Sequence, residues 1–315
     1  MRQKKNSNMS IAYLFLILAP MMVGINIVGS KYLITSMPVL FLLAVRFLVA
    51  AVLLLPLHWL TPDGKQNALV YLKQLSKKDW CFLIAQALTA GVFFNVLMVM
   101  GLQYTDANIA GVITSALPAI IVIMSCIVLK DRFTIKKMVC VGFATVGLVV
   151  INAAHISGHT ANYSMLGNLL VFLSLLPEAS YYILTKLHPS RLPIFLMSSV
   201  INLINAVILL PILGYYLNWK LLNLPVFDWL ILIVVGIASG LFYVFWYIGS
   251  AKVDAVMAAL STAFMPIATI AIAWLTLGEK IDIIQFIGVI MIIMSILAYA
   301  LPFRMQWNHK KNHNL

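Results

Sequence analysis

The sequence predicts an all-α polytopic membrane protein with ten transmembrane helices arranged as two inverted five-helix repeats. Three observations predict this fold class: the composition, the spacing of the apolar segments and an internal repeat. Hydrophobic residues make up 63% of the 315 residues and charged residues only 10%, and the mean hydropathy is +1.02. Soluble domains carry roughly 25% charged residues and disordered chains are poor in apolar ones, so the composition excludes both classes.

Apolar segments of roughly 20 residues, the length that spans a bilayer, recur between short polar connections. They predict spans at 11–33, 38–60, 80–102, 107–129, 135–154, 165–187, 193–216, 228–250, 255–277 and 282–302. In the longest connection, 61–79, Leu69, Leu72 and Leu75 recur at helical spacing beside lysines, which predicts a short helix at the membrane surface. The first span is longer than the apolar part of a signal peptide, so we expect it to remain in the protein.

The basic residues are unequally divided between the two sides of the predicted spans. Most lysines and arginines lie on the side of the N-terminus, whereas the opposite side holds only Lys31, Lys220 and Lys280. Because positive charge favours the cytoplasmic side, we expect both termini in the cytoplasm and the protein in the cytoplasmic (inner) membrane. This bias and attraction to anionic lipid explain the net charge of +12, so we expect no nucleic-acid partner.

The chain contains an internal repeat. A shift of 148 residues aligns Gly101 with Gly249 and Pro118 with Pro266, and shifts of 149 and 155 align the earlier spans. Further matched pairs are Asp79-Trp80 with Asp228-Trp229, Asp106 with Asp254, Thr114 with Thr262, Asp131 with Glu279, Lys31 with Lys186, Pro38 with Pro193 and Pro56 with Pro211. Such an ordered series, interrupted only by small gaps, indicates a duplication.

Each repeat holds five spans, and an odd number places the second repeat upside down relative to the first. The predicted repeats cover 11–154 and 165–302, flanked by a cytoplasmic N-terminus, 1–10, and a basic cytoplasmic tail, 303–315. Inverted repeats are typical of transporters that expose a central site alternately to the two sides of the membrane.

These residues resemble the drug/metabolite transporter superfamily, in particular its EamA-domain permeases with two five-helix repeats. The resemblance covers about 11–302 and rests on these residues: Gly24-Ile25-Asn26, Lys31, Pro38, Arg46, then Gly101, Pro118 and Asp131 in the first repeat and Gly249, Pro266 and Glu279 in the second. The chain departs from the family pattern at Val23, Asp131 and Cys140. The resemblance implies a ten-helix transporter of small metabolites in the cytoplasmic membrane that does not hydrolyse ATP.

Only two charged residues lie deep within predicted spans, Arg46 and Glu178. A charge at the bilayer centre costs roughly 2.5–3.5 kcal/mol on insertion scales, so each side chain should face a partner or a hydrated cavity. Glu178 is a candidate proton carrier or acceptor for a cationic group, because desolvation disfavours its anion; a structural ion pair or a neutral hydrogen-bonded acid is the alternative. Arg46 is a candidate for binding a carboxylate or phosphate, or an anchor on backbone carbonyls or on Glu178.

Four prolines occupy matched positions within spans. Pro20 and Pro177 lie in the first and sixth spans, and Pro118 and Pro266 in the fourth and ninth. Each removes an internal hydrogen bond, which is tolerated where a cavity or a neighbour satisfies the freed carbonyl. Matched helix breaks in both halves indicate the binding region of a transporter, and a kink for packing is the alternative.

Polar and aromatic side chains near the middle of the spans complete the predicted substrate site, which comprises Asn26, Arg46, Asn95, Thr114, Glu178, Tyr181, Tyr182, Tyr243 and Trp246. A mostly apolar pocket with a few polar groups and aromatic walls is typical of small-molecule sites. Helix packing alone also explains each of these side chains taken singly, since polar groups join helices within membranes.

Other features have structural interpretations. Gly236 and Gly240 form a GxxxG pattern, which indicates close helix contact within the bundle or at the face of a homodimer. Lys31 and Lys186 are interpreted as lysines that reach the membrane surface, with a gating role as the alternative. We expect acidic residues at helix starts, such as Asp254, to favour the helix dipole. The cysteines have no metal-ligand spacing, so we expect no metal site and no cofactor.

Together these patterns predict a secondary transporter, importer or exporter, of a small metabolite such as an amino acid or a related polar or amphipathic compound. It is expected to use alternating access around a midplane site, driven by proton coupling or exchange. An integral-membrane enzyme acting on a lipid-linked substrate is the alternative, but the sequence lacks the clustered acids or the nucleophile–base set that such chemistry needs. A passive channel explains neither Glu178 nor the matched prolines. We therefore expect a transporter rather than an enzyme.

Overall fold

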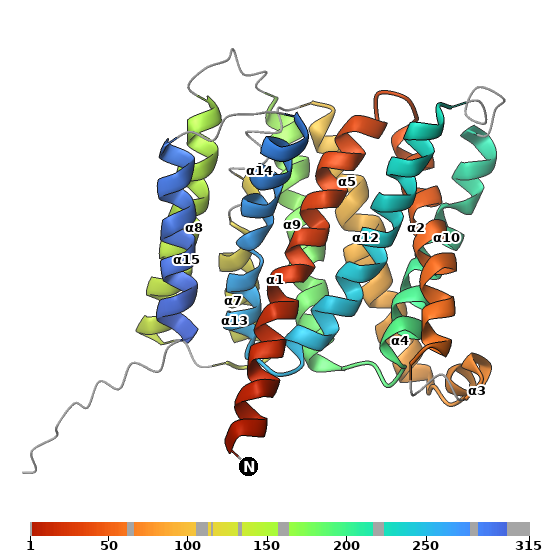
Figure 1. Cartoon of the computed structure of the whole chain (residues 1–315), viewed down its shortest axis with the longest axis horizontal. Helices are drawn as coiled ribbons and strands as arrows, with labels where there is room; N and C mark the ends of the chain where they lie inside the picture. The colour runs from red at the N-terminus through yellow and green to blue at the C-terminus, as the bar shows by residue number, and fades with distance from the viewer. Residues whose placement is uncertain are drawn as a thin grey trace, which may run out of the picture.

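All regular structure in the described part of the chain is helical. The computed structural model describes residues 2–61, 66–104, 113–114, 116–131, 134–156, 164–216, 224–277 and 283–300, and no strand occurs among them. The long helices stand side by side with their axes roughly aligned (Figure 1). A helix satisfies its own backbone hydrogen bonds, which a chain within a lipid bilayer requires.

The described helices follow the predicted spans closely, except that α1 begins earlier. In chain order they are α1 (Arg2–Leu33), α2 (Val39–Trp59), α3 (Ala68–Lys73), α4 (Lys77–Gln86), η2 (Ala87–Phe93), α5 (Phe94–Leu102), α7 (Leu117–Val128), α8 (Ile135–Ile156), α9 (Met165–Leu187), α10 (Ile194–Tyr216), α12 (Val226–Ser250), α13 (Ala255–Ser261), α14 (Phe264–Leu277) and α15 (Ile283–Ala300). The first part of the predicted span 107–129, the acids Asp106 and Glu279, and the predicted tail 303–315 lie outside the described residues.

Several described helices have the length and composition of membrane spans. Six segments qualify: Ser10–Ser30, Val39–Trp59, Lys77–Gly101, Met165–Leu187, Ile194–Pro211 and Val226–Ser250. Two shorter apolar helices, Leu117–Val128 and Phe286–Tyr299, accompany them. The chain is therefore a multi-pass helical membrane protein.

The distribution of side chains agrees with lipid as the surrounding solvent. Val52 and Val207 are each 58% exposed and Ile127 is 73% exposed, whereas Arg46 is 5% and Glu178 is 4% exposed. Apolar side chains thus cover the outside, and charged groups face the interior. Intramembrane charges face a bundle interior because lipid cannot solvate them.

Polar caps fix the starts of several helices. Ser76 and Asp79 form a capping box at the start of α4, and Asn67 caps α3. The predicted role of Asp254 is confirmed, since its Oδ1 accepts a hydrogen bond of 2.8 Å from the backbone N–H of Met257 in α13. Caps of this kind satisfy N–H groups that have no partner within the helix.

The short helix predicted in the connection 61–79 is α3. It lies at the lower end of the bundle in Figure 1, the end at which α1 also begins. We call this the α3 end. Leu69 is 60% exposed, whereas Leu72 and Leu75 pack against the core. One face of the segment is thus anchored on the bundle while the other remains outside.

The helix breaks predicted at Pro20 and Pro177 are not present. Both α1 and α9 continue through these residues. In a long membrane helix, local adjustment and neighbouring groups compensate for the single hydrogen bond that a proline removes, so the helix continues.

The second proline pair does accompany helix interruptions. Between α13 and α14 the helix is interrupted at Thr262 and Ala263, directly before Pro266. Likewise α7 begins at Leu117 after a turn residue, with Pro118 in its first turn. The proline ring clashes with the carbonyl four residues earlier, which for Pro266 is the carbonyl of Thr262. The matched interruptions are therefore confined to these two prolines.

A π-helical turn that the sequence did not predict lies within the third span. This turn, η2, separates α4 from α5. The Asn95 side-chain amide donates hydrogen bonds to the carbonyls of Ala90 (3.0 Å) and Gly91 (2.7 Å). π-turns often occur at functional sites, and here one side chain stabilises the irregular backbone.

Helices α1–α8 pack mainly against helices α9–α15. Thus α1 lies beside α12 and α14, α2 beside α10, α5 beside α9, and α8 beside α15; the α8–α15 and α2–α10 pairs form opposite edges of the bundle in Figure 1. A Cβ atom on Gly236 would lie 2.5 Å from Val49, and one on Gly240 would lie 2.6 Å from Leu54. The GxxxG pattern therefore allows close contact between α12 and α2 within the bundle.

Candidate substrate site

Arg46 projects from α2 into the interior, where it binds two polar side chains. Its Nη2 donates a hydrogen bond to Asn95 Oδ1 (2.7 Å), its Nη1 donates one to Ser30 Oγ (3.5 Å), and its guanidinium lies over the Phe47 ring at 5.0 Å from the centroid. The buried Nε has no hydrogen-bond partner in the described part of the chain. Because a guanidinium carries five N–H donors, Arg46 anchors Asn95 and still retains a donor for another ligand.

Glu178, on α9, is the other charged residue predicted deep within a span, and it is also buried. Its Oε1 accepts a hydrogen bond of 2.7 Å from the Tyr182 hydroxyl, while Oε2 has no partner among the described residues. The only ion pair found in the described ranges joins Asp79 and His188. Arg46 and Glu178 therefore do not neutralise each other, which was one of the interpretations left open by the sequence.

Aromatic rings from α9 and α12 surround Glu178. The ring centroids of Tyr182 and Trp246 are 4.2 Å apart, and those of Tyr181 and Tyr243 are 5.6 Å apart. The Trp246 indole donates a hydrogen bond of 3.3 Å to Thr185 Oγ1, which fixes the ring. Five of the predicted site residues, including Glu178, are thus brought into one cluster, and aromatic faces of this kind attract cations.

Tyr243 connects this cluster to Arg46. The tyrosine lies close enough to both Arg46 and Glu178 for electrostatic interaction with each of them. The two charged residues thus belong to one polar region at the centre of the bundle rather than to separate sites.

Of the remaining predicted site residues, Asn26 and Asn95 bond to groups on other helices. Asn26 Oδ1 accepts a hydrogen bond of 3.2 Å from Ser239 Oγ, which joins α1 to α12. Thr114 lies in the short helical segment before the interruption that precedes α7. Asn95 holds both η2 and Arg46, so it belongs to the central polar region through Arg46.

Sequence analysis missed two asparagines on α10, Asn202 and Asn205. Both side chains are fully buried. The Asn202 Nδ2 donates to the carbonyl of Ser198 (2.8 Å), but its Oδ1 and both amide atoms of Asn205 make no hydrogen bond of standard geometry within the described residues. The Tyr243 hydroxyl lies near the Asn205 amide. Two amides three residues apart on one face of a largely apolar span were a detectable signal, because polar groups inside membranes are costly unless they are satisfied.

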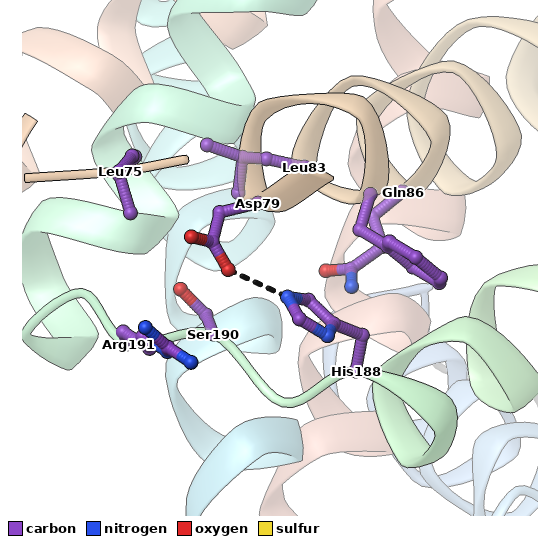
Figure 2. A pocket seen from close by; sticks show the side chains of 8 residues that line it. Leu75, Asp79, Leu83, Gln86, His188, Ser190 and Arg191 are labelled. Atoms are coloured by element: carbon purple, nitrogen blue, oxygen red, sulfur yellow. Dashed lines mark hydrogen bonds and ion pairs between the residues drawn. The ribbon is translucent and has the colours of Figure 1, made fainter. Parts of the chain in front are cut away.

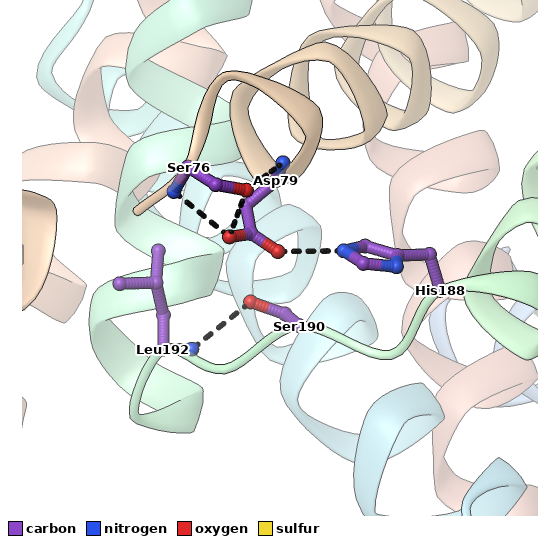
Figure 3. A network of polar contacts seen from close by, with 5 residues as sticks. All are labelled: Ser76, Asp79, His188, Ser190 and Leu192. Atoms are coloured by element: carbon purple, nitrogen blue, oxygen red, sulfur yellow. Dashed lines mark hydrogen bonds and ion pairs between the residues drawn. The ribbon is translucent and has the colours of Figure 1, made fainter. Parts of the chain in front are cut away.

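A second polar group lies at the α3 end, away from the predicted site. Asp79 Oδ1 and His188 Nε2 are 2.6 Å apart, and Asp79 Oδ2 accepts hydrogen bonds from the backbone and hydroxyl of Ser76 (Figure 3). Phe82 stacks on the His188 ring. Figure 2 shows the small pocket beside this pair, lined by Leu75, Asp79, Phe82, Leu83, Gln86, His188, Ser190 and Arg191.

Two further contacts join helices near this pocket. The Lys186 amine donates hydrogen bonds to the carbonyls of Ser250, the last residue of α12, and of Val253, which follows the helix. The Tyr247 hydroxyl donates to Gln86 Oε1. Lys186 is only partly buried. Its amine binds carbonyls at a helix end, a position that suits a cation, instead of extending freely to the membrane surface.

Comparison with known sequences places the chain in a family. The pattern of the EamA-like transporter family matches residues 10–153 and again residues 165–301. The chain belongs to the EamA-like transporter family. The drug/metabolite transporter superfamily indicated by its sequence motifs is therefore confirmed.

Relatives of this EamA-family protein carry transporter names. Two proteins of Bacillus subtilis (strain 168), the uncharacterized transporters YetK and YyaM, are each 26% identical to it. The YetK match spans 90% of this chain and 85% of the relative, and the YyaM match spans 80% and 81%. The family and these relatives indicate that this EamA-family protein is a membrane transporter rather than an enzyme.

A solved crystal structure supports the fold of this EamA-family protein. It aligns with a TM-score of 0.73 at 16% sequence identity and covers 94% of this chain and 96% of the other. At this identity the likeness shows the shared fold and carries no information on substrate.

Proposed function

We propose that this EamA-family protein is a secondary transporter, importer or exporter, of a small metabolite that carries both a carboxylate and an ammonium group, such as an amino acid. The observation that carries this proposal is the pair of buried, oppositely charged residues Arg46 and Glu178, which do not pair with each other. A zwitterion provides a carboxylate for the free guanidinium donor and an ammonium for the free carboxylate oxygen. Binding then offsets part of the cost of keeping both groups within the membrane.

An architecture of ten helices in two inverted repeats, covering 11–154 and 165–302, is part of the proposal. The helix contacts support it. If each helix is replaced by its equivalent in the other repeat, the α1–α12 contact becomes the α9–α5 contact, and the α1–α14 contact becomes the α9–α7 contact. The same operation leaves the α2–α10 and α8–α15 pairs unchanged. A duplicated unit with internal two-fold symmetry predicts this pattern.

Two glycine contacts support the same symmetry at the level of single residues. A Cβ on Gly249 would lie 3.1 Å from the carbonyl of Ala12 and 2.8 Å from Leu16, while one on its repeat partner, Gly101, would lie 3.0 Å from the carbonyl of Gly167 and 2.7 Å from Val171. The shift of 155 residues that aligns the early spans takes Ala12 to Gly167 and Leu16 to Val171. Equivalent helices therefore meet in equivalent registers.

The course of the chain in Figure 1 also supports inversion. The span made of α4, η2 and α5 rises from the α3 end, whereas α12, its equivalent in the second repeat, descends towards that end. Because the basic connections favour the cytoplasm, we place the α3 end in the cytoplasm and the protein in the cytoplasmic membrane, with both termini inside.

In the proposed cycle the contacts at the α3 end form a cytoplasmic gate. The Asp79–His188 pair joins α4 to the connection after α9, and Lys186 joins the end of α9 to the end of α12. Opening to the cytoplasm separates these groups, and the inverted repeats then close the opposite face. The central polar region is thereby exposed to one side of the membrane at a time.

Glu178 provides the proposed coupling to protons. Its Oε2 binds either a proton or the ammonium group of the substrate, and the two compete for the same carboxylate. Desolvation favours the neutral acid when no cation is present. A site that must carry one or the other across the membrane couples the substrate gradient to the proton gradient.

A thermal-shift screen of the purified full-length protein tests the proposed substrate class. The panel comprises amino acids, nucleobases, S-adenosyl compounds and amines, each alone. We expect at least one amino acid to raise the unfolding temperature, because a ligand that binds only the folded state stabilises it, and we expect the same compound to be transported in proteoliposomes. Stabilisation only by compounds that lack a carboxylate would contradict the proposal.

A further inference from the structure

Asn205 lies on α10 in contact with the π-helical turn of the third span. A Cβ atom on Gly91 would lie 2.0 Å from Asn205 Nδ2, so only glycine at position 91 allows the amide to approach the backbone of η2. The Tyr243 hydroxyl lies near the same amide, within reach of a hydrogen-bonding interaction. Asn205 is thus placed between the turn that Asn95 holds and the tyrosine that connects Arg46 and Glu178.

Among the described residues the Asn205 amide makes no hydrogen bond of standard geometry, although the Tyr243 hydroxyl lies near enough to interact with it. The side chain is 0% exposed, and neither Nδ2 nor Oδ1 has a hydrogen-bond partner of acceptable geometry in the part of the chain that is described. Asn95, only one helix away, is the opposite case, because its side chain accepts from Arg46 and donates to two carbonyls. A buried amide whose hydrogen-bonding capacity is incompletely used lowers stability, which makes Asn205 a candidate for ligand binding.

Besides the ring nitrogens of His58, the other buried side-chain atoms without a hydrogen-bond partner among the described residues are Arg46 Nε, Glu178 Oε2, Tyr181 Oη and Asn202 Oδ1. The first three of these belong to the central polar region. The charged groups suit the charged ends of a ligand. An amide differs from both, because it donates and accepts at once without carrying charge.

We propose that Asn205 is a substrate-binding residue that recognises an uncharged hydrogen-bonding group, an amide or a hydroxyl, located between the two charged ends of the substrate. The inference rests on the proposed transport function and adds to it the polarity of the middle of the substrate. Gly91 serves this site by leaving room for the amide beside η2.

A pair of substitutions separates a binding role of Asn205 from a structural one without any ligand. We expect N205L to raise the unfolding temperature of the full-length protein by about 2–4 °C, since it removes unsatisfied polar atoms from the core. The matched control N95L removes a fully bonded amide and is expected to lower the unfolding temperature. If N205L lowers it as N95L does, Asn205 is structural and the inference is wrong; N205A provides the same comparison where leucine does not fit.

Cysteine accessibility tests whether the Asn205 position can be reached by a polar ligand. The background is the full chain with Cys81, Cys126 and Cys140 replaced by alanine, and the probe is the water-soluble cation 2-(trimethylammonium)ethyl methanethiosulfonate. We expect N205C in proteoliposomes to react, whereas L203C, on the outer face of the same helix, and A206C, buried against α2, do not. An unreactive N205C overturns the inference.

The substrate class is tested with the compounds that stabilise the wild-type protein. We expect N205L to weaken binding of those with a central amide or hydroxyl at least tenfold and to affect those without one by less than threefold. Equal effects on both groups overturn the inference while leaving the transport proposal intact. If instead no compound is transported but N205C reacts and N205L is stabilised, the transport proposal fails and a polar ligand site remains.

Discussion

Proteoliposomes containing Glu178→Gln are expected to lose pH-gradient-driven uptake, down to the level of protein-free liposomes. Glutamine keeps the size of the side chain and a carbonyl oxygen that can accept from the Tyr182 hydroxyl, which now bonds to Oε1 at 2.7 Å. It cannot exchange a proton or attract an ammonium group. The measurement is uptake of a compound found in the thermal-shift screen, with and without an imposed pH gradient.

The folding of this variant provides the control. Because glutamine is uncharged and needs no bound proton to stay neutral when buried, we expect the unfolding temperature of Glu178→Gln to equal or exceed that of the wild-type protein. Tyr182→Phe removes the hydroxyl that binds Oε1 but leaves the carboxyl group, so it should retain coupling. Unchanged dependence on the pH gradient in Glu178→Gln would rule out the proton role of Glu178.

Arg46→Ala is expected to weaken the binding of carboxylate-bearing substrates by about 10- to 100-fold. A hydrogen bond to a charged group contributes about 1.5–3 kcal/mol, and each 1.4 kcal/mol corresponds to roughly tenfold in affinity. The methyl ester of the same compound lacks the carboxylate and should lose much less. The measurement is the concentration dependence of the thermal shift for an acid and for its ester.

Asn95→Ala is the matched control for this variant. Arg46 anchors Asn95, and Asn95 in turn holds the carbonyls of Ala90 and Gly91, so both substitutions disturb η2, but only Arg46→Ala removes the guanidinium. The selective loss for the acid should therefore appear in Arg46→Ala and not in Asn95→Ala. Equal loss of acid and ester in both variants, together with a lower yield of folded protein, would identify Arg46 as a structural anchor alone.

Much of the helical framework could be predicted because membrane spans are set by local composition. The predicted span 165–187 coincides with α9, and 38–60 differs from α2 by one residue at each end. The local irregularities of the helices were harder to predict from the sequence. The continuation of the helix through Pro20 and Pro177 depends on compensation by the surrounding structure, and the π-turn at Ala87–Phe93 depends on the Asn95 side chain.

The candidate site was predictable in part for a similar reason. A charge such as Arg46 or Glu178 within an apolar span is visible in the sequence because its cost is high wherever it points. Burying an asparagine in a span costs less free energy than burying a charge. Whether its amide forms hydrogen bonds with its neighbours or lacks partners depends on tertiary contacts. Asn95 and Asn205 have the same side chain, but only the structure distinguishes the bonded amide from the unsatisfied one.

Pulsed electron–electron spin-resonance distances test alternating access between inverted repeats most directly. One spin-label pair, Lys78→Cys with Arg191→Cys, reports on the α3 end, and the other, Thr35→Cys with Phe227→Cys, reports on the opposite end, where the rings of Tyr32 and Phe227 are in contact. Both pairs are placed in the chain without native cysteines, reconstituted in lipid at two pH values with and without substrate. The account predicts that one distance lengthens whenever the other shortens. Two distances that stay fixed, or that lengthen together, would contradict it.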